Sequence, residues 1–315
     1  MTLILNTDPT RTTLLRRKFI NDMSKRFRLL QKDITELVVK DDVFGLGDLP
    51  GKVELRKEGL TVLQQPRAFE FLTNPQKVQA YQKWLQTQID TKILTVDGMG
   101  KPWTATYIES AHKKGMLRAY TDVNKLKLAT DKPDFYAGSR EQFLSSAFGQ
   151  PELLSKIELL SLRAFEQLKG VTTTMSSQMS RILAEGLSRG DGPMKIARTL
   201  NKSVATLSRT RSRMIARTEI INAHAEGQLD SFEMLGVDEV GIKAEWSTAG
   251  DERICEQCSA MEGEVFLVED SHGLIPLHPN CRCAWIPAPL TKEQQRRKVK
   301  ERKALEKRLP IFSQK

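Results

Sequence analysis

All four cysteines of this 315-residue chain lie in one short segment near its C-terminus, CEQCSAMEGEVFLVEDSHGLIPLHPNCRC. They are Cys255, Cys258, Cys281 and Cys283. A Cys-x2-Cys turn brings two thiolates to one side of the backbone, which suits a single tetrahedral metal ion. The segment His278-x2-Cys281-x-Cys283 supplies further donors. This spacing predicts a zinc-stabilised clasp that holds an otherwise apolar-poor segment in a defined fold.

Five donors compete for four places in such a clasp. The simplest ligand set contains Cys255, Cys258 and Cys281, with either His278 or Cys283 as the fourth ligand. A zinc ion with four protein ligands has no open position for water, so the predicted role is structural. A disulfide pair is the second interpretation and inert buried thiols are the third. His272 lies in a Ser-His-Gly sequence, and we expect it to be a solvent-exposed loop residue.

A rival interpretation places a zinc-dependent enzyme acting on nucleic acid, a deaminase or nuclease, at His224, Glu226, Cys255 and Cys258. The order of these residues follows the His-x-Glu and Pro-Cys-x-x-Cys signature of zinc deaminases. However, Ile254 stands where that signature has proline. The rival also leaves the second half of the cysteine segment unexplained. No other catalytic motif stands out in the sequence, and we predict that the protein is not an enzyme.

Hydrophobic spacing predicts a mainly α-helical chain. Apolar residues recur every three or four positions in 11–38, from Ile20 to Leu37, and again after Asn74-Pro75. Further helices are expected at 104–123, at 151–170 with a stop at Gly170, and from Ser203 to Leu235, whereas 124–150 reads as irregular. Strands are expected within 237–248, 264–269 and 284–290. The predicted fold class is therefore mainly α with a small α+β C-terminal domain, in which long helices accompany a short β region clasped by Cys and His.

The net charge is +10, and it is concentrated in three segments. These segments are 11–32, 201–217 and 291–315. Segregated positive charge favours a polyanion or an acidic protein surface as a neighbour. No run of apolar residues is long enough for a membrane span, and the N-terminus lacks the basic and apolar regions of a secretion signal. We therefore expect a protein made and kept in a cytosol, without a membrane partner.

Four ordered motifs carry a resemblance to a known family. They are ARTEIINAHAEGQLDSF, WSTAGD, CEQCSAMEGEVF and PLHPNCRC. Together they resemble the phage Mu protein F-like family of head morphogenesis proteins, over roughly residues 150–287. The resemblance implies a minor head protein with mainly structural site residues. It suggests an Arg217–Glu219 salt bridge or cap within the domain, and a charge on Arg282 that offsets thiolates or faces a partner.

The resemblance also implies partners and a location. Expected partners are the portal protein, the major capsid or scaffolding protein, and packaged double-stranded DNA. The expected location is the host cytoplasm during assembly, and then the procapsid and virion head. The predicted organisation is a helical N-terminal arm or docking region (1–150), a Mu F-like head morphogenesis domain with the clasp (151–290) and a basic helical tail (291–315).

Overall fold

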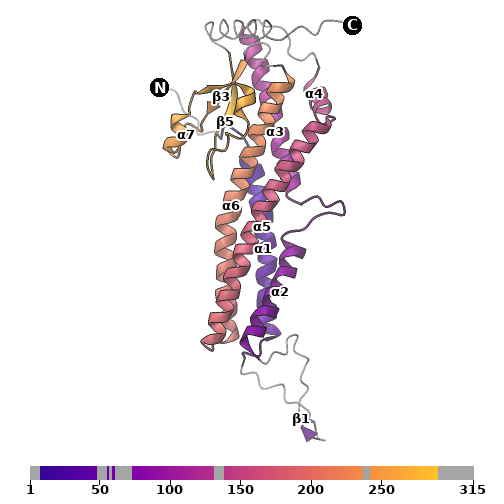
Figure 1. Ribbon diagram of the computed structural model, residues 1–315, viewed down its shortest axis with the longest axis vertical. Coiled ribbons are helices and arrows are strands. Elements are labelled where there is room, and N and C mark those ends of the chain that lie inside the picture. The colour runs from indigo at the N-terminus through magenta and orange to yellow at the C-terminus, as the bar shows by residue number, and fades with distance from the viewer. Residues whose placement is uncertain are drawn as a thin grey trace, which may run out of the picture. The chain divides into compact units, whose positions relative to one another are not determined.

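The structure is a computed structural model, drawn in Figure 1. It describes residues 8–47, 55–56, 59–60, 73–130, 138–236 and 242–289. The predicted fold class is confirmed, because the chain is mostly helical and carries a small antiparallel sheet near its C-terminus, close to the cysteines. The predicted basic tail, 291–315, lies outside the described residues. Within the described residues, no helix combines the length and hydropathy that crossing a membrane requires.

The chain forms two compact units, each assembled from separate segments. Unit 1 contains Met1–Leu15, Tyr107–Leu160 and Arg217–Lys315. Unit 2 contains Arg16–Thr106 and Ser161–Ala216. The boundaries near 150 and 290 that the sequence suggested stay a prediction.

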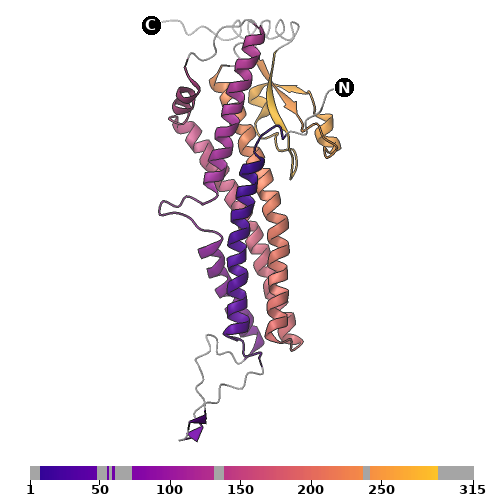
Figure 2. The same ribbon diagram turned by 180° about the vertical axis from the view of Figure 1, so that it is seen from behind.

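Unit 2 is built from long helices that run side by side (Figures 1 and 2). They are most of α1 (Thr13–Thr35), the π-helical turn η1 (Glu36–Lys40), α2 (Asn74–Lys92), and the unit 2 parts of α5 (Pro151–Ser188) and α6 (Pro193–Met234). Between α1 and α2 lie two short strands, β1 (Leu55–Arg56) and β2 (Gly59–Leu60), which pair antiparallel.

The buried stripe of α1 follows the predicted three- and four-residue spacing. Met23, Phe27, Leu30 and Ile34 are buried, and burial of such a stripe is what stabilises a helix of this kind in a protein. The stripe begins at Phe19, not at Ile20 as predicted. The helix therefore turns an apolar side chain to the interior about once per turn, while Lys25, Arg28 and Lys32 between them are exposed.

Contacts of polar side chains fix the helices of unit 2 to one another. The Gln31 amide donates to the Asn201 carbonyl at 2.8 Å, and the Asn201 amide donates to Thr35 Oγ1 at 2.8 Å. The Arg26 guanidinium, five residues before Gln31 on α1, lies 4.2 Å from the centre of the Trp103 ring. These contacts tie α1 to α6 and to the segment before α3.

Two predicted helix breaks are wrong. Helix α5 continues through Gly170, and α6 continues through Ser203, so each is one long helix. The hydroxyls of Thr172 and Thr174 donate to the carbonyls of Lys169 and Gly170, so they bond within the helix instead of capping a new one. A single interior glycine costs a helix only ~1 kcal/mol relative to alanine, which the packing of a long helix offsets.

The prediction of irregular structure over 124–150 is also wrong in part. Helix α3 (Ala105–Thr130) extends beyond the predicted end, and α4 (Arg140–Ala147) follows it. Ser139 caps α4: its hydroxyl accepts from the Gln142 N–H, and the Gln142 side chain accepts from the Ser139 N–H. This reciprocal capping box satisfies two N–H groups that the helix itself leaves unpaired.

In unit 1, α3 and the C-terminal half of α6 cross at very short distance. A Cβ added to Gly115 would lie 2.0 Å from the His224 carbonyl oxygen, and one added to Gly227 would lie 2.2 Å from the His112 carbonyl oxygen. Only glycine leaves room for two backbones at this separation. The crossing buries Met116, Ile221 and Leu229 in one core cluster.

A three-stranded antiparallel sheet lies beside this part of α6 (Figures 1 and 2). Its order is β4 (Val265–Phe266), β3 (Ile242–Ser247) and β5 (Ala284–Pro289). The last strand, β5, lies at an edge of this sheet and pairs with β3. Trp246 and Trp285 are opposite one another in the register, with ring centres 5.3 Å apart in an edge-to-face arrangement. Gln228 of α6 donates to the Trp285 carbonyl at 2.6 Å and accepts from its N–H at 3.1 Å.

Candidate metal centre

The first half of the site is a cysteine turn that begins a short helix. Cys255 is the N-cap of α7 (Glu256–Ala260), and its sulfur accepts from the backbone N–H of Cys258 at 3.4 Å. One turn of helix therefore brings both sulfurs to the same side. Cys255 is exposed and Cys258 is buried, so the pair faces from the protein surface into the core.

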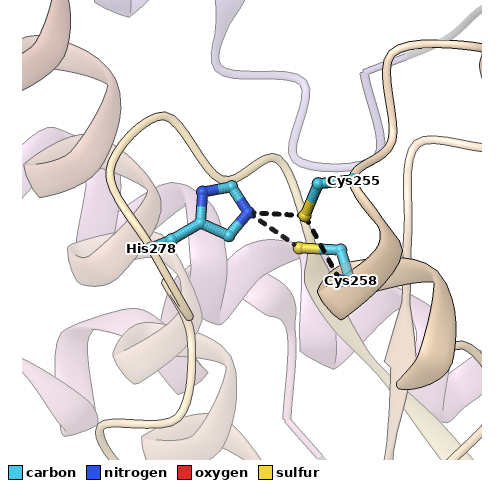
Figure 3. Close-up of side chains that lie close together, drawn as sticks. All are labelled: Cys255, Cys258 and His278. Atoms are coloured by element: carbon cyan, nitrogen blue, oxygen red, sulfur yellow. Dashed lines mark hydrogen bonds between the residues drawn. The ribbon is translucent and has the colours of Figure 1, made fainter.

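His278 lies against both of these sulfurs, as Figure 3 shows. Its Nε2 is 3.1 Å from Cys255 Sγ and 3.1 Å from Cys258 Sγ. Its Nδ1 donates to the Pro279 carbonyl at 2.8 Å, and because a carbonyl oxygen only accepts, the proton of the neutral ring resides on Nδ1. The lone pair of Nε2 consequently points to the sulfurs, as it does in a metal-ligating histidine.

Cys281 and Cys283 form a second group of three donors with Cys258, the residue that both groups share. The sulfurs of Cys258, Cys281 and Cys283 all lie within 4.8 Å of one another. Tetrahedral zinc with Zn–S bonds of ~2.3 Å has a sulfur–sulfur edge of ~3.8 Å. Cys258 Sγ and Cys281 Sγ are 3.8 Å apart. The donor types and this separation fit a zinc ion with sulfur and imidazole ligands.

Hydrogen bonds divide the thiols into two kinds. The Cys258 N–H lowers the pKa of Cys255. A hydrogen bond from the Cys283 thiol lowers the pKa of Cys281 to about 5, and the same bond raises the pKa of Cys283. Burial raises the pKa of Cys258 to about 12. Cys255 and Cys281 are therefore the thiols that most readily become thiolates, whereas Cys283 more readily keeps its proton.

Side chains next to the cluster hold its second half against α6 and the preceding loop. The backbone N–H of Asn280 donates to Thr218 Oγ1 on α6 at 3.2 Å. Arg282 makes a two-pronged salt bridge to Asp251, with one nitrogen–oxygen distance of 2.6 Å. This guanidinium holds the pKa of Asp251 well below its usual range. Arg282 therefore pairs with a carboxylate of its own chain. This pairing is neither of the two predicted roles, which were to offset thiolates or to face a partner.

The ligand set of the rival deaminase interpretation is not brought together. His224 is buried on α6, neither of its ring nitrogens has a hydrogen-bond partner within the described residues, and burial lowers its pKa to about 3. The Glu226 carboxylate is hydrogen-bonded to His272 and Gly273 and not to the cysteine residues. Neither residue joins the cysteines in the groups of donors that the described residues form.

His272 is not the exposed loop residue that the sequence suggested. Its Nδ1 lies 2.6 Å from Glu226 Oε2 and its Nε2 lies 2.9 Å from Glu233 Oε1. Hydrogen bonds to the two carboxylates raise the pKa of His272 to about 9, and the bond to Glu226 has the larger effect. The ring is therefore an imidazolium at neutral pH. The residue follows α8 (Val268–Ser271) and fixes that turn to α6. A hint in the sequence was available, because Glu226, Asp230 and Glu233 are spaced to lie on one face of a helix.

The same acidic face continues into a buried network. Asp230 accepts from Lys156 Nζ at 2.7 Å and lies 2.7 Å from His112 Nε2. Although Asp230, Glu233 and His272 lie close enough together to hold a cation, Lys156 supplies the positive charge there and both His272 nitrogens are engaged. This cluster is therefore a network of salt bridges that joins α3, α5, α6 and the turn after α8.

Comparison with known families supports the resemblance seen in the sequence. Residues 177–286 match the family described as phage Mu protein F like protein. The resemblance predicted a start near residue 150, whereas the matched segment begins at residue 177. The matched segment contains all five candidate ligands. No curated protein and no solved structure matches the chain. Residues 177–286, with the long helix α6, the small sheet and the cysteine–histidine cluster, are thus the phage Mu protein F-like part of the chain.

Proposed function

We propose that this protein is a minor head protein that acts in phage head morphogenesis at the portal vertex. The observation that carries the proposal is the family match over residues 177–286, because that family is one of phage head proteins with structural roles. The proposed location is the host cytoplasm during assembly, followed by the procapsid and virion head. The proposed protein partners are the portal protein and the major capsid or scaffolding protein.

We further propose that Cys255, Cys258, His278 and Cys281 are the ligands of a structural zinc ion. His278 is chosen over Cys283 because its Nε2 contacts two sulfurs of the set, whereas Cys283 bonds to Cys281. Zinc bound there would cross-link α7 to the 278–283 segment, and four protein ligands would leave no position for a reacting water. The chain's own residues orient the site: Pro279 fixes the His278 tautomer and Thr218 anchors Asn280.

The exposed charge on α6 supports contact with packaged DNA. Lys202, Arg209, Arg211 and Arg213 are all exposed on the unit 2 part of this helix. Side chains of this kind bind backbone phosphates without reading sequence, so any such binding should weaken steeply with salt. This contact would be a general attraction to DNA beside the head interior, not recognition of a site.

The metal proposal is tested by zinc content of the full chain, purified under reducing conditions without chelator. Cys281→Ser should lower zinc content well below one ion per chain, whereas Cys283→Ser and His224→Ala should keep it. Circular dichroism of each variant verifies that the helices remain folded. Zinc lost with His224→Ala, or retained fully by Cys281→Ser, would contradict the proposed ligand set.

The head proposal is tested in the phage genome that encodes the chain. A stop codon early in the gene should reduce the yield of filled heads, and mass spectrometry of purified procapsids should find the wild-type protein in few copies. Portal protein should co-purify with the tagged chain from cells making both. Normal heads that never contain the protein would refute a role in assembly, whatever the zinc content.

A further inference from the structure

A cavity of about 300 Å³ lies in unit 1, and none of the five candidate metal ligands lines it. Its walls are the N-terminal residues Thr10 and Arg11, one face of α3, and Arg140 at the start of α4. The α3 face runs from Lys114 through Arg118 to Lys125, at helical spacings that place these side chains in one row. A volume of this size falls at the lower end of small-ligand pockets.

The lining is strongly positive. Among the described residues, five cations line the cavity against one carboxylate, that of Asp122, which gives these residues a net charge of +4. The cations are Arg11, Lys114, Arg118, Lys125 and Arg140. Asp122 is already paired with Arg118 one turn away on α3. Among the described residues no acid forms a salt bridge with any of the other four, so like charges face one another around the same space.

The cluster of cations around the cavity favours a polyvalent anion as its ligand. Cations that share a cavity repel one another, and a polyvalent anion between them removes that repulsion. Arginine offers a planar fork and lysine a mobile point charge, and both bind phosphate oxygens. None of the described residues that line the cavity is aromatic, so these residues offer no surface on which a nucleobase could stack. The Thr121 hydroxyl donates to the Leu117 carbonyl, which leaves recognition to the cations.

We propose that this cavity binds phosphate groups, through Lys114, Lys125, Arg140 and Arg11. The phosphate chemistry is the same for a free polyphosphate and for the backbone of a nucleic acid. The proposal does not rest on the metal centre or on the role in the phage head. It locates a binding site outside the residues matched by the family, on α3 and the segments beside it.

The test uses the full chain with inorganic pyrophosphate and, separately, a fluorescein-labelled DNA duplex. The variant is Lys114→Gln with Lys125→Gln. The control is Lys113→Gln, because Lys113 is an exposed neighbour on the same helix that does not line the cavity. Calorimetry measures pyrophosphate binding at fixed ionic strength, and anisotropy measures DNA binding over a series of salt concentrations. Thermal melting and circular dichroism verify that the variants are folded.

If free phosphate is the ligand, the double variant should bind pyrophosphate at least tenfold more weakly while the control matches wild type. If the source is the nucleic-acid backbone, pyrophosphate should bind weakly in all proteins. DNA affinity should then fall at least tenfold in the double variant alone, with the salt slope reduced by ~2, near one per lost phosphate contact. No binding of either probe, or equal losses in the double variant and the control, would overturn the proposal.

Discussion

Replacing Gly115 with alanine tests the helix crossing that organises unit 1. The added Cβ would lie 2.0 Å from the His224 carbonyl oxygen, whereas ordinary contact begins near 3.4 Å. The obstacle is backbone, which cannot rotate away as a side chain can. Helices α3 and α6 must therefore separate locally by about 1.4 Å, and a gap of 0.5–1 Å already forfeits about a quarter to a half of the dispersion attraction across it.

The expected cost follows from three terms. Overpacking of a core costs about 1–3 kcal/mol, and separated helices lose further contacts around Met116, Ile221 and Leu229. Alanine returns about 1 kcal/mol through its higher helix propensity. We expect a net destabilisation of about 3 kcal/mol, which is a large fraction of the 5–15 kcal/mol that typically stabilises a domain. With a urea slope of ~3 kcal/mol/M, the midpoint should fall by ~1 M.

Urea unfolding followed by circular dichroism measures this effect. The matched control is Gly170→Ala on α5, where the same added Cβ meets nothing within 4 Å. That change should raise the stability by up to about 1 kcal/mol, because only the propensity term acts. A loss of stability in Gly115→Ala together with a gain in Gly170→Ala would identify the helix crossing as the cause of the loss. A Gly115→Ala protein as stable as wild type would refute the close approach of α3 and α6.

Three further predictions concern contacts on α6 and the metal centre. Gln228→Leu leaves the buried N–H and carbonyl of Trp285 unpaired, so the free energy of unfolding should fall by about 1–3 kcal/mol per unpaired group, measured by urea titration. His272 has a pKa of about 9 against an ordinary 6.5, so its stabilising charge is complete below about pH 6.5 and is lost as pH rises through about 9. The difference in melting temperature between wild type and His272→Gln should shrink over that interval, and a constant difference would contradict the assignment. A zinc chelator under reducing conditions should change the near-ultraviolet dichroism of the Trp246–Trp285 pair, and readdition of zinc should restore it.

Local signals in the sequence were sufficient for several elements. The spacing of Met23, Phe27, Leu30 and Ile34 indicated the buried face of α1, because helical periodicity depends only on neighbours three and four positions away. The Asn74-Pro75 start of α2 was equally local. The predicted breaks at Gly170 and Ser203 failed because weak helix-breaking preferences were outweighed by the packing of long helices, which the sequence does not display.

Residue identity and spacing were enough to indicate a chain dominated by helices, and a site with four cysteines and His278 at spacings that suit one metal ion. Which of these residues meet depends on the packing of distant segments. This packing excludes His224 from the cluster by burying it at the crossing with α3, and it brings His272 to Glu226 and Glu233, 46 and 39 positions away. The physical reason is that turn chemistry and periodicity act between near neighbours. Encounters between distant residues depend on how closely helices approach, which here is set by two glycines and the buried faces around them.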